Sequence, residues 1–165
     1  MTVEPNMFRQ ALSKFASGVT VISTLTPEKA PVGVTVSAFT SLSLTPPLVL
    51  ICLDRSTAQL GAYTDGPSFC VNILASGQQA ISNAFAYPGP IPPFDSVPYD
   101  TGHLGLPVIR GTSASLECRR EAVYPGGDHM IIIGAVLHAA WNDDLEPLIY
   151  AAGAYRSLAA PEPVA

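Results

Sequence analysis

GVTVSAFTSLSLTPPLVLICLDRST, residues 33–57, is the stretch from which the fold can be read. It contains a strand with small hydroxyl side chains, a Pro-Pro break, an apolar strand and a polar turn that leads into a helix. The first strand alternates apolar and hydroxyl residues, namely Val34, Thr35, Val36 and Ser37. This alternation is typical of a half-buried strand, and its small hydroxyls leave room for a flat heterocycle. An ordinary polar sheet face is the alternative, because Thr is a good strand former.

Strand-like runs continue along the chain, separated by turns rich in Pro, Gly or Asp, at 19–25, 32–38, 48–53, 69–74, 113–124 and 130–141. Two short segments, 57–63 and 78–86, are compatible with helices. Apolar residues at helical spacing from Phe8 to Phe15 predict one more helix, which we expect to cover the barrel as a lid. The pattern predicts a mostly β protein, an antiparallel Greek-key-like barrel with a few short flanking helices.

The length of 165 residues suits a single domain spanning 1–165, with its core at about 8–158 and a flexible tail at 159–165. The start of the chain resembles no export signal and no long apolar run follows, so we expect a cytoplasmic protein without a membrane partner. The net charge of −5 and the scattered basic residues argue against nucleic acid as a partner. Only 13% of the residues are charged, which predicts that a partner subunit covers apolar surface in a homodimer.

The chemistry of several common enzyme classes lacks its sequence motifs in this chain. It contains no GxSxG, GxxxxGK[ST], HExxH or GxGxxG pattern. The cysteines Cys52, Cys70 and Cys118 lie in apolar strand-like runs without metal-ligand spacing, so we expect buried reduced thiols and no metal site.

A polar turn with one basic residue precedes the second expected helix, and its residues are Asp54, Arg55, Ser56 and Thr57. If Ser56 or Thr57 is the N-cap, the free N–H groups and the positive end of the helix dipole favour an anion such as phosphate. Arg55 adds a full positive charge. Plain helix capping is the alternative.

One histidine stands out by its position. A turn of Gly126, Gly127 and Asp128 comes before His129, which begins an apolar strand. We therefore expect its imidazole at a barrel end beside a cavity mouth. By contrast, His138 reads as a core residue within a strand and His103 as a solvated loop residue.

Five motifs in a fixed order resemble the flavin reductase domain family, the FMN-binding split barrel. They are the opening 33–57 segment, FCVNIL at 69–74, GDH at 127–129 running into IIIGAV at 131–136, PLIY at 147–150 and GAY at 153–155. The resemblance covers about residues 8–158. It implies a homodimeric NAD(P)H:flavin oxidoreductase that binds flavin near the subunit interface and releases reduced flavin to a separate oxygenase component.

The resemblance also implies roles for individual residues. Thr35, Ser37, Ala38 and Ser41 would line the isoalloxazine ring, and Asp54, Arg55, Ser56 and Thr57 would surround the flavin phosphate. Asn72, Ser82 and Phe85 would lie near the phosphate or the adenine, although core packing explains Phe85 equally well. His129 would contact flavin or nicotinamide as the catalytic residue, in the role of an orienting hydrogen-bond donor. Tyr155 would lie near the ring or the partner subunit, with a place at the rim of the core as the alternative.

The leading hypothesis is a reductase that transfers a hydride from NADH or NADPH to FMN or FAD, a reaction that needs donors and ring stacking more than a base. A non-catalytic FMN sensor or storage protein on the same barrel is the main alternative. An oxidase of pyridoxamine-phosphate type would need a basic cluster that the chain lacks. No Lys or Arg lies between Arg55 and Arg110, so the diphosphate of FAD would find little charge compensation here, and either FMN is preferred or FAD binds loosely.

Overall fold

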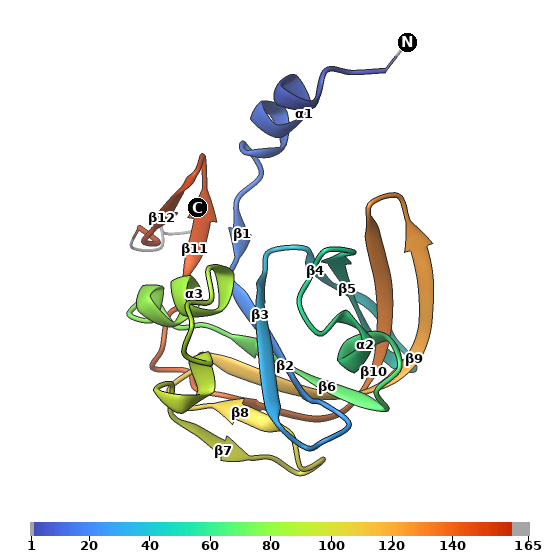
Figure 1. Cartoon of the computed structure of the whole chain (residues 1–165). Coiled ribbons are helices and arrows are strands. Elements are labelled where there is room, and N and C mark those ends of the chain that lie inside the picture. The colour runs from blue at the N-terminus through green and yellow to red at the C-terminus, as the bar shows by residue number, and fades with distance from the viewer. Residues whose placement is uncertain (1, 160–165) are drawn as a thin grey trace.

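The computed structural model describes residues 2–159 and contains a seven-stranded antiparallel sheet that curls into a barrel (Figure 1). The strand order is β3-β2-β6-β9-β10-β5-β4. The bounds of these strands are β2 Thr20–Leu25, β3 Pro31–Val36, β4 Phe39–Leu44, β5 Pro47–Asp54, β6 Ser68–Ile73, β9 Ala114–Gly126 and β10 His129–Trp141. The predicted class, a mostly β antiparallel barrel, is confirmed.

The two edges of this sheet meet at one short connection. β3 and β4 lie at opposite ends of the strand order, yet only Ser37 and Ala38 separate them in the chain. The Cys52 backbone N–H donates to the Ala38 carbonyl at 3.0 Å, which ties this connection to β5. Because the sheet must curl to bring its edges together, Ser37 and Ala38 mark where the barrel closes.

The hairpin of β9 and β10 is the longest unit of the sheet. Gly127, with a φ of 70°, makes the turn that the sequence predicts, in a conformation that favours glycine. His129 opens β10 and pairs in register with Asp54 at the end of β5. This register brings the turn after β5 beside the hairpin turn, although the two are more than seventy residues apart in the sequence.

Two clusters of buried residues form the core. The inside of the barrel is filled by one cluster whose largest members are Ile22, Ile51, Leu53, Tyr63, Phe69 and Ile132. The second cluster lies beneath helix α3 (Gln79–Ala86) and the 3-10 helix η1 (Pro93–Asp95), and includes Phe85, Phe94 and Leu148. The Phe85 and Phe94 rings meet edge to face with their centroids 4.8 Å apart.

Several short elements surround the barrel. They are β1 Ser17–Gly18, α2 Leu60–Thr64, β7 Tyr99–Thr101, β8 Pro107–Ile109, β11 Ile149–Ala151 and β12 Ala154–Arg156. Apart from α2, the sequence predicts none of these elements, because two or three residues show no periodicity. It does not predict β4 as a separate strand either, because β4 continues the hydroxyl-rich run after β3. Within 2–159, no helix has the length and apolar character needed to cross a membrane. Most of the expected tail, 160–165, lies outside the described residues.

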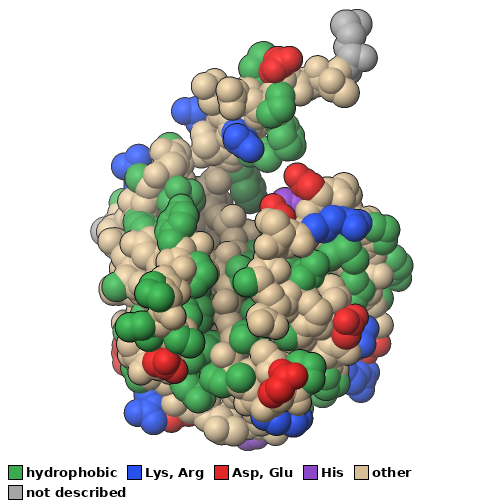
Figure 2. Space-filling model, in the orientation of Figure 1, with side chains coloured by type: hydrophobic (Ala, Val, Ile, Leu, Met, Phe, Trp, Pro, Cys, Tyr) green, Lys and Arg blue, Asp and Glu red, His purple; other side chains and the backbone are tan. Residues whose placement is uncertain are grey.

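Helix α1 (Pro5–Leu12) is not the lid that its apolar spacing predicts. It buries none of its residues, and both views show it standing clear of the barrel (Figures 1 and 2). The spacing correctly predicts a helix with an apolar face, but spacing does not specify which surface covers that face. Met7, Phe8, Leu12 and the following Phe15 remain exposed in this chain.

Candidate functional site

Three hollows open where β3 passes into β4, and Ser37 lines all of them. We name them by one residue each. The histidine hollow has a volume of ≈ 250 Å³, the tyrosine hollow ≈ 280 Å³ and the arginine hollow ≈ 770 Å³. They share Ser37 and, in pairs, further lining residues, so the three hollows adjoin one another along this segment.

Distant parts of the chain contribute to each hollow. The histidine hollow is lined chiefly by Thr35, Ser37, Ala38, Cys52, Asp54, Thr57 and His129. The tyrosine hollow is lined chiefly by Thr35, Ser37, Ser82, Asn83, Tyr87, Tyr150 and Tyr155. The arginine hollow lies below α1 and is lined chiefly by Arg9, Leu12, Phe15, Ser37, Ala38, Cys52 and Tyr150. Figure 2 shows the space beneath α1 with acidic side chains and a histidine on the neighbouring rim of the barrel.

The segment shared by the hollows offers small polar groups. The Thr35 hydroxyl donates to the Ser82 carbonyl at 2.7 Å, which joins β3 to α3. The side chain of Ser37 is exposed, and its hydroxyl has no hydrogen-bond partner among the described residues. Ser37 is therefore free to bond a ligand, while the methyl side chain of Ala38 leaves space for a flat ring.

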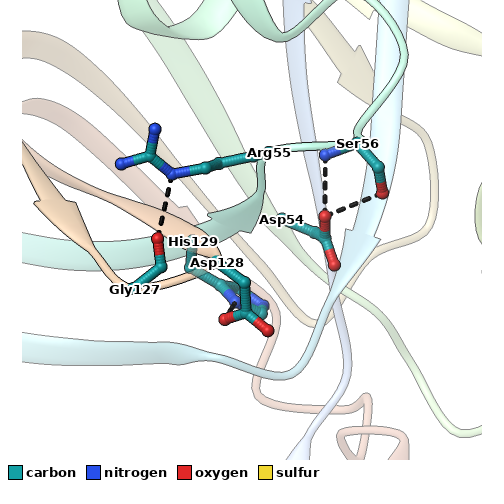
Figure 3. A network of polar contacts seen from close by, with 6 residues as sticks. All are labelled: Asp54, Arg55, Ser56, Gly127, Asp128 and His129. Atoms are coloured by element: carbon teal, nitrogen blue, oxygen red, sulfur yellow. Dashed lines mark hydrogen bonds and ion pairs between the residues drawn. The ribbon is translucent and has the colours of Figure 1, made fainter.

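The polar end of the histidine hollow joins two turns (Figure 3). His129 Nδ1 lies 2.7 Å from Asp128 Oδ1, and the His129 side chain is 40% exposed. A carboxylate only accepts hydrogen bonds, so Nδ1 carries the proton toward Asp128. Consequently Nε2 presents an acceptor when the ring is neutral and a donor when the ring is protonated.

The turn after β5 is held by its own side chains. The Ser56 N–H and hydroxyl both donate to Asp54 Oδ1 at 2.7 Å, and these bonds hold the Asp54 pKa below its usual range. Arg55 Nε donates to the Gly127 carbonyl at 3.0 Å, which connects this turn to the hairpin. The terminal nitrogens of Arg55 have no partner within the described part of the chain and can still bind an anion.

The expected helix cap at Ser56 or Thr57 is wrong. Helix α2 begins only at Leu60. Its N-cap is Gln59, which has a φ of 58° and whose side chain makes no capping hydrogen bond. The Thr57 N–H instead donates to the Asp54 carbonyl, so the chain makes a turn before the helix can start. The anion argument therefore loses the helix dipole and depends on Arg55 and the side chain of Thr57.

The tyrosine hollow has a hydroxyl at its wall. The Tyr155 hydroxyl lies 2.9 Å from Ser82 Oγ and 2.7 Å from Asn83 Oδ1. With a single proton, it donates to the amide oxygen of Asn83 and accepts from Ser82. Tyr150 meets Tyr155 edge to face at 5.5 Å, so this hollow is aromatic and uncharged.

Five of the residues expected near the cofactor line none of the three hollows, namely Ser41, Arg55, Ser56, Asn72 and Phe85. Asn72 is completely buried, and its amide donates to Val21 O and Ser23 Oγ and accepts from the N–H of Ile109. Phe85 is 2% exposed and packs in the second core cluster. Ser41 is exposed on β4 and lines none of the three hollows. Asn72 and Phe85 are core residues here, because the strand and helix that carry them turn these side chains inward.

We expect Asn72→Ala to lower the free energy of unfolding by roughly 2–4 kcal/mol, because buried partners lose their hydrogen bonds. The dissociation constant of FMN should stay unchanged in the folded variant, since no atom of Asn72 is exposed. Urea unfolding and a fluorescence titration with FMN measure both. The exposed Asn142→Ala variant serves as the control and should lose about 1 kcal/mol at most. A weakened affinity for FMN in Asn72→Ala would return this residue to the site.

Cys52, Arg9 and Tyr150 line the hollows but were missed as functional residues. Cys52 was expected in the core, yet it lies between the buried Ile51 and Leu53, so strand alternation already places it on the other face. The sequence gives no comparable indication for Arg9, because its position beside the hollow depends on how helix α1 is placed relative to the barrel.

The two other histidines lie together away from these hollows. His138 is partly exposed, and its ring centroid lies 3.7 Å from that of His103, which corrects the expectation of a core histidine. The buried Glu117 accepts the backbone N–H groups of His103 and Leu104 at 2.8 and 2.7 Å. The carboxylate of Glu117 thus anchors the loop between β7 and β8.

Comparison with known proteins agrees with this arrangement. The sequence model described as "Flavin reductase like domain" matches residues 12–159. The chain belongs to this flavin reductase family. The resemblance seen in the sequence motifs is thereby confirmed.

Relatives of this flavin reductase domain cover nearly its whole length. The FMN reductase (NADH) SmoA of Agrobacterium fabrum is 42% identical over 148 residues, which are 90% of this chain and 83% of the relative. The reductase component of 4-hydroxyphenylacetate 3-monooxygenase from Thermus thermophilus is 37% identical over 93% of this chain and 97% of its own. Among solved structures, the Streptomyces globisporus NADH:FAD oxidoreductase SgcE6 in complex with NAD and FAD fragments superimposes with a TM-score of 0.89 at 35% identity, covering 96% of this chain and 97% of that one.

Proposed function

We propose that this chain is an NADH-dependent flavin reductase that supplies reduced FMN or FAD to a separate monooxygenase. The observation that carries the proposal is the uncharged segment from Thr35 to Ala38, which closes the barrel beside His129 and contributes to the walls of three adjoining hollows. Membership of the flavin reductase family and the names of the relatives support the same activity.

The residues of the site fit a flat ring system. The hollows join over small side chains, and the walls offer donors and acceptors without a bulky group at Ser37 or Ala38. A bound flavin accepts a hydride from a reduced nicotinamide at its N5 atom and gains negative charge near N1 and O2. The protein contributes by holding two rings in contact, by excluding water and by placing the Ser37 hydroxyl and backbone N–H groups at the polar rim.

We assign His129 the role of an orienting group at the mouth of the histidine hollow. Asp128 fixes its ring through Nδ1 and leaves Nε2 pointing away from that bond. A protonated ring donates from Nε2 to a carbonyl oxygen of the nicotinamide or the flavin. This role needs a fixed donor and no proton transfer, because hydride transfer to flavin does not require a base in the protein.

We further propose FMN as the preferred flavin. The phosphate would lie near Thr57 and the terminal nitrogens of Arg55, while Asp54 keeps its negative charge on the same rim. The single guanidinium of Arg55 can form paired hydrogen bonds with the one phosphate group of FMN. The tyrosine hollow, where the other half of FAD would extend, has no charged side chain, so FAD would bind more weakly.

Anaerobic stopped-flow absorbance tests the function. The protein is mixed at catalytic concentration with FMN or FAD and with NADH or NADPH, in all four combinations. We expect the oxidised-flavin band to bleach fastest with FMN and NADH. Tight flavin binding without bleaching would replace the reductase by a flavin sensor or storage protein, and the absence of flavin binding would overturn both.

We also propose that the functional unit is a homodimer in the cytoplasm. Helix α1 exposes Met7 and Phe8 without covering its own barrel, and Leu137 and Trp141 of β10 are exposed as well. Such apolar surface is suited to a second copy of the chain. All three cysteines are unpaired, which is consistent with a reducing compartment. Sedimentation equilibrium should give twice the chain mass, and a monomer at micromolar concentration would refute the dimer.

Cys52 offers a chemical check of the site. Partial burial raises the pKa of its thiol, so alkylation by iodoacetamide should be slow at pH 7 and should accelerate as the pH rises. FMN at ten times its dissociation constant should slow the reaction about tenfold, because only the free fraction reacts. Cys70 and Cys118 are completely buried and should stay unlabelled in the folded protein. Mass spectrometry locates the label, Cys52→Ser is the control, and an unchanged rate with FMN would place the flavin elsewhere.

A further inference from the structure

The arginine hollow is the largest of the three hollows, and among the residues that the structure describes only one charged residue lines it. Its walls are mainly apolar or hydroxyl side chains from α1, β4, β5 and β11, and Arg9 is the exception. Asp54 and His129 line the histidine hollow, and the tyrosine hollow has no charged lining residue. Among residues 2–159, Arg9 is therefore the single permanently cationic side chain that lines these adjoining hollows.

The backbone at Arg9 is held in place, and the charge of its side chain is available. The end of α1 is tied to the turn between β11 and β12, because the Ala152 N–H donates to the Ser13 carbonyl at 2.8 Å. The Ser13 N–H in turn donates to the Arg9 carbonyl at 2.9 Å. Within residues 2–159, the guanidinium of Arg9 takes part in no ion pair and no hydrogen bond.

A free guanidinium beside an apolar wall is suited to a phosphate-bearing ligand. Its planar fork can give two parallel hydrogen bonds to phosphate oxygens. The hollow shares Ser37, Ala38 and Cys52 with the histidine hollow, so a second ring stacked on a flavin would extend from this shared wall toward Arg9. Arg55, to which we assign the flavin phosphate, is bonded to the hairpin turn at Gly127 and does not line the arginine hollow.

We propose that Arg9 binds the diphosphate of the dinucleotide hydride donor, so that the projecting helix α1 is part of the NADH site. This inference rests on the proposed reductase function. It assigns a substrate-binding residue to a helix that has no packing role in its own chain. The same diphosphate chemistry occurs in FAD, and the test must therefore separate the donor from the flavin.

The test uses FMN as the acceptor and two hydride donors. NADH carries the diphosphate, whereas 1-benzyl-1,4-dihydronicotinamide has the same reacting ring and no phosphate. We expect Arg9→Ala to raise the KM for NADH roughly tenfold, or about 1.4 kcal/mol, with kcat and the KM for the benzyl donor unchanged. Arg9→Lys should fall between the wild type and Arg9→Ala, because it keeps the charge but loses the fork.

Binding and salt dependence give readouts that do not rely on turnover. Calorimetric titration of NAD+ into the FMN-loaded protein should show a tenfold higher dissociation constant in Arg9→Ala than in the wild type. The KM for NADH should rise with NaCl in the wild type and much less in Arg9→Ala, because the screened ion pair is gone. Lys14→Ala is the matched control, because Lys14 is a basic residue close to α1 that lines none of the three hollows. Its loss should change neither the KM for NADH nor the dissociation constant of NAD+.

Three results would overturn the proposal. An equal increase in the KM for both donors in Arg9→Ala would mean that the substitution disturbs the shape of the site and removes no contact to the diphosphate. An increased KM for FAD with an unchanged KM for NADH would assign the diphosphate to the flavin. If Lys14→Ala raised the KM for NADH as much as Arg9→Ala does, the cause would be the lost positive charge near the site and not a contact made by Arg9. If neither donor reduces flavin in the wild type, the reductase function itself fails, which is a different outcome from any of these.

Discussion

Ser37→Leu is expected to weaken FMN binding by about 100-fold, equivalent to about 2.7 kcal/mol. Ser37 lines all three hollows and lies where the barrel closes, so a branched side chain there would occupy the space of the ring. Its hydroxyl, which has no protein partner among the described residues, would be lost as well. Quenching of FMN fluorescence gives the dissociation constant, and stopped-flow absorbance gives the rate of flavin reduction at saturating FMN.

The fold of this variant should be intact because Ser37 is exposed. Urea unfolding should therefore give a free energy within about 1 kcal/mol of the wild type. Ser76→Leu, on an exposed turn remote from the hollows, controls for an added apolar surface residue. If FMN bound Ser37→Leu as tightly as it binds the wild type, the flavin would not lie on the closing segment and the site would have to be reassigned.

His129→Ala is expected to lower kcat/KM for NADH by roughly 10- to 100-fold, the range for loss of one hydrogen bond from a charged donor. The affinity for FMN should change much less, because Ser37 and Arg55 remain. Steady-state kinetics with NADH varied at saturating FMN measure the first quantity, and a fluorescence titration measures the second. Unchanged kinetics for both substrates would remove His129 from the mechanism.

Two further variants separate a donor role of His129 from a purely steric one. His129→Gln should restore part of the rate that His129→Ala loses, because its amide still donates a hydrogen bond. Asp128→Asn removes the carboxylate that holds the ring through Nδ1, so kcat/KM for NADH should fall less than in His129→Ala while the affinity for FMN stays unchanged. Steady-state kinetics with NADH varied at saturating FMN measure both variants, and equal rates in His129→Gln and His129→Ala would contradict the donor role.

The sequence allowed the larger part of the fold to be predicted, and most of the residues that it proposes for the site line one of the hollows. Strand alternation located the long strands, and the Gly126–Asp128 turn placed His129 at the mouth of a hollow, as the structure has it. Thr35, Ser37, Ala38, Asp54, Thr57, Ser82, His129 and Tyr155 all line the histidine or the tyrosine hollow. These residues lie at strand ends or on helix faces whose direction follows from local spacing.

Local spacing failed where a neighbour far along the chain decides the environment. Asn72 looked available for a ligand, but Ser23 and Ile109 use its amide and β8 covers it. Phe85 lies against Phe94 and faces Gly33, where even a Cβ atom would come within 2.6 Å of the ring. The expected cap at Thr57 is wrong for a local reason, because two successive turns, Thr57 N–H to Asp54 O and Leu60 N–H to Thr57 O, delay the start of the helix to Leu60.

Local sequence determined which segments became strands, because a strand's two faces follow from a period of two residues. It also determined that small hydroxyls, a glycine turn and one histidine would be available for binding. Only the tertiary structure decided that these groups meet. The closing of the sheet at Ser37 and Ala38, the pairing of Asp54 with His129 and the position of Arg9 beside the largest hollow depend on contacts between residues that are remote in the chain. Periodicity reports which way a side chain faces, and the partner that it meets there depends on how the whole chain packs.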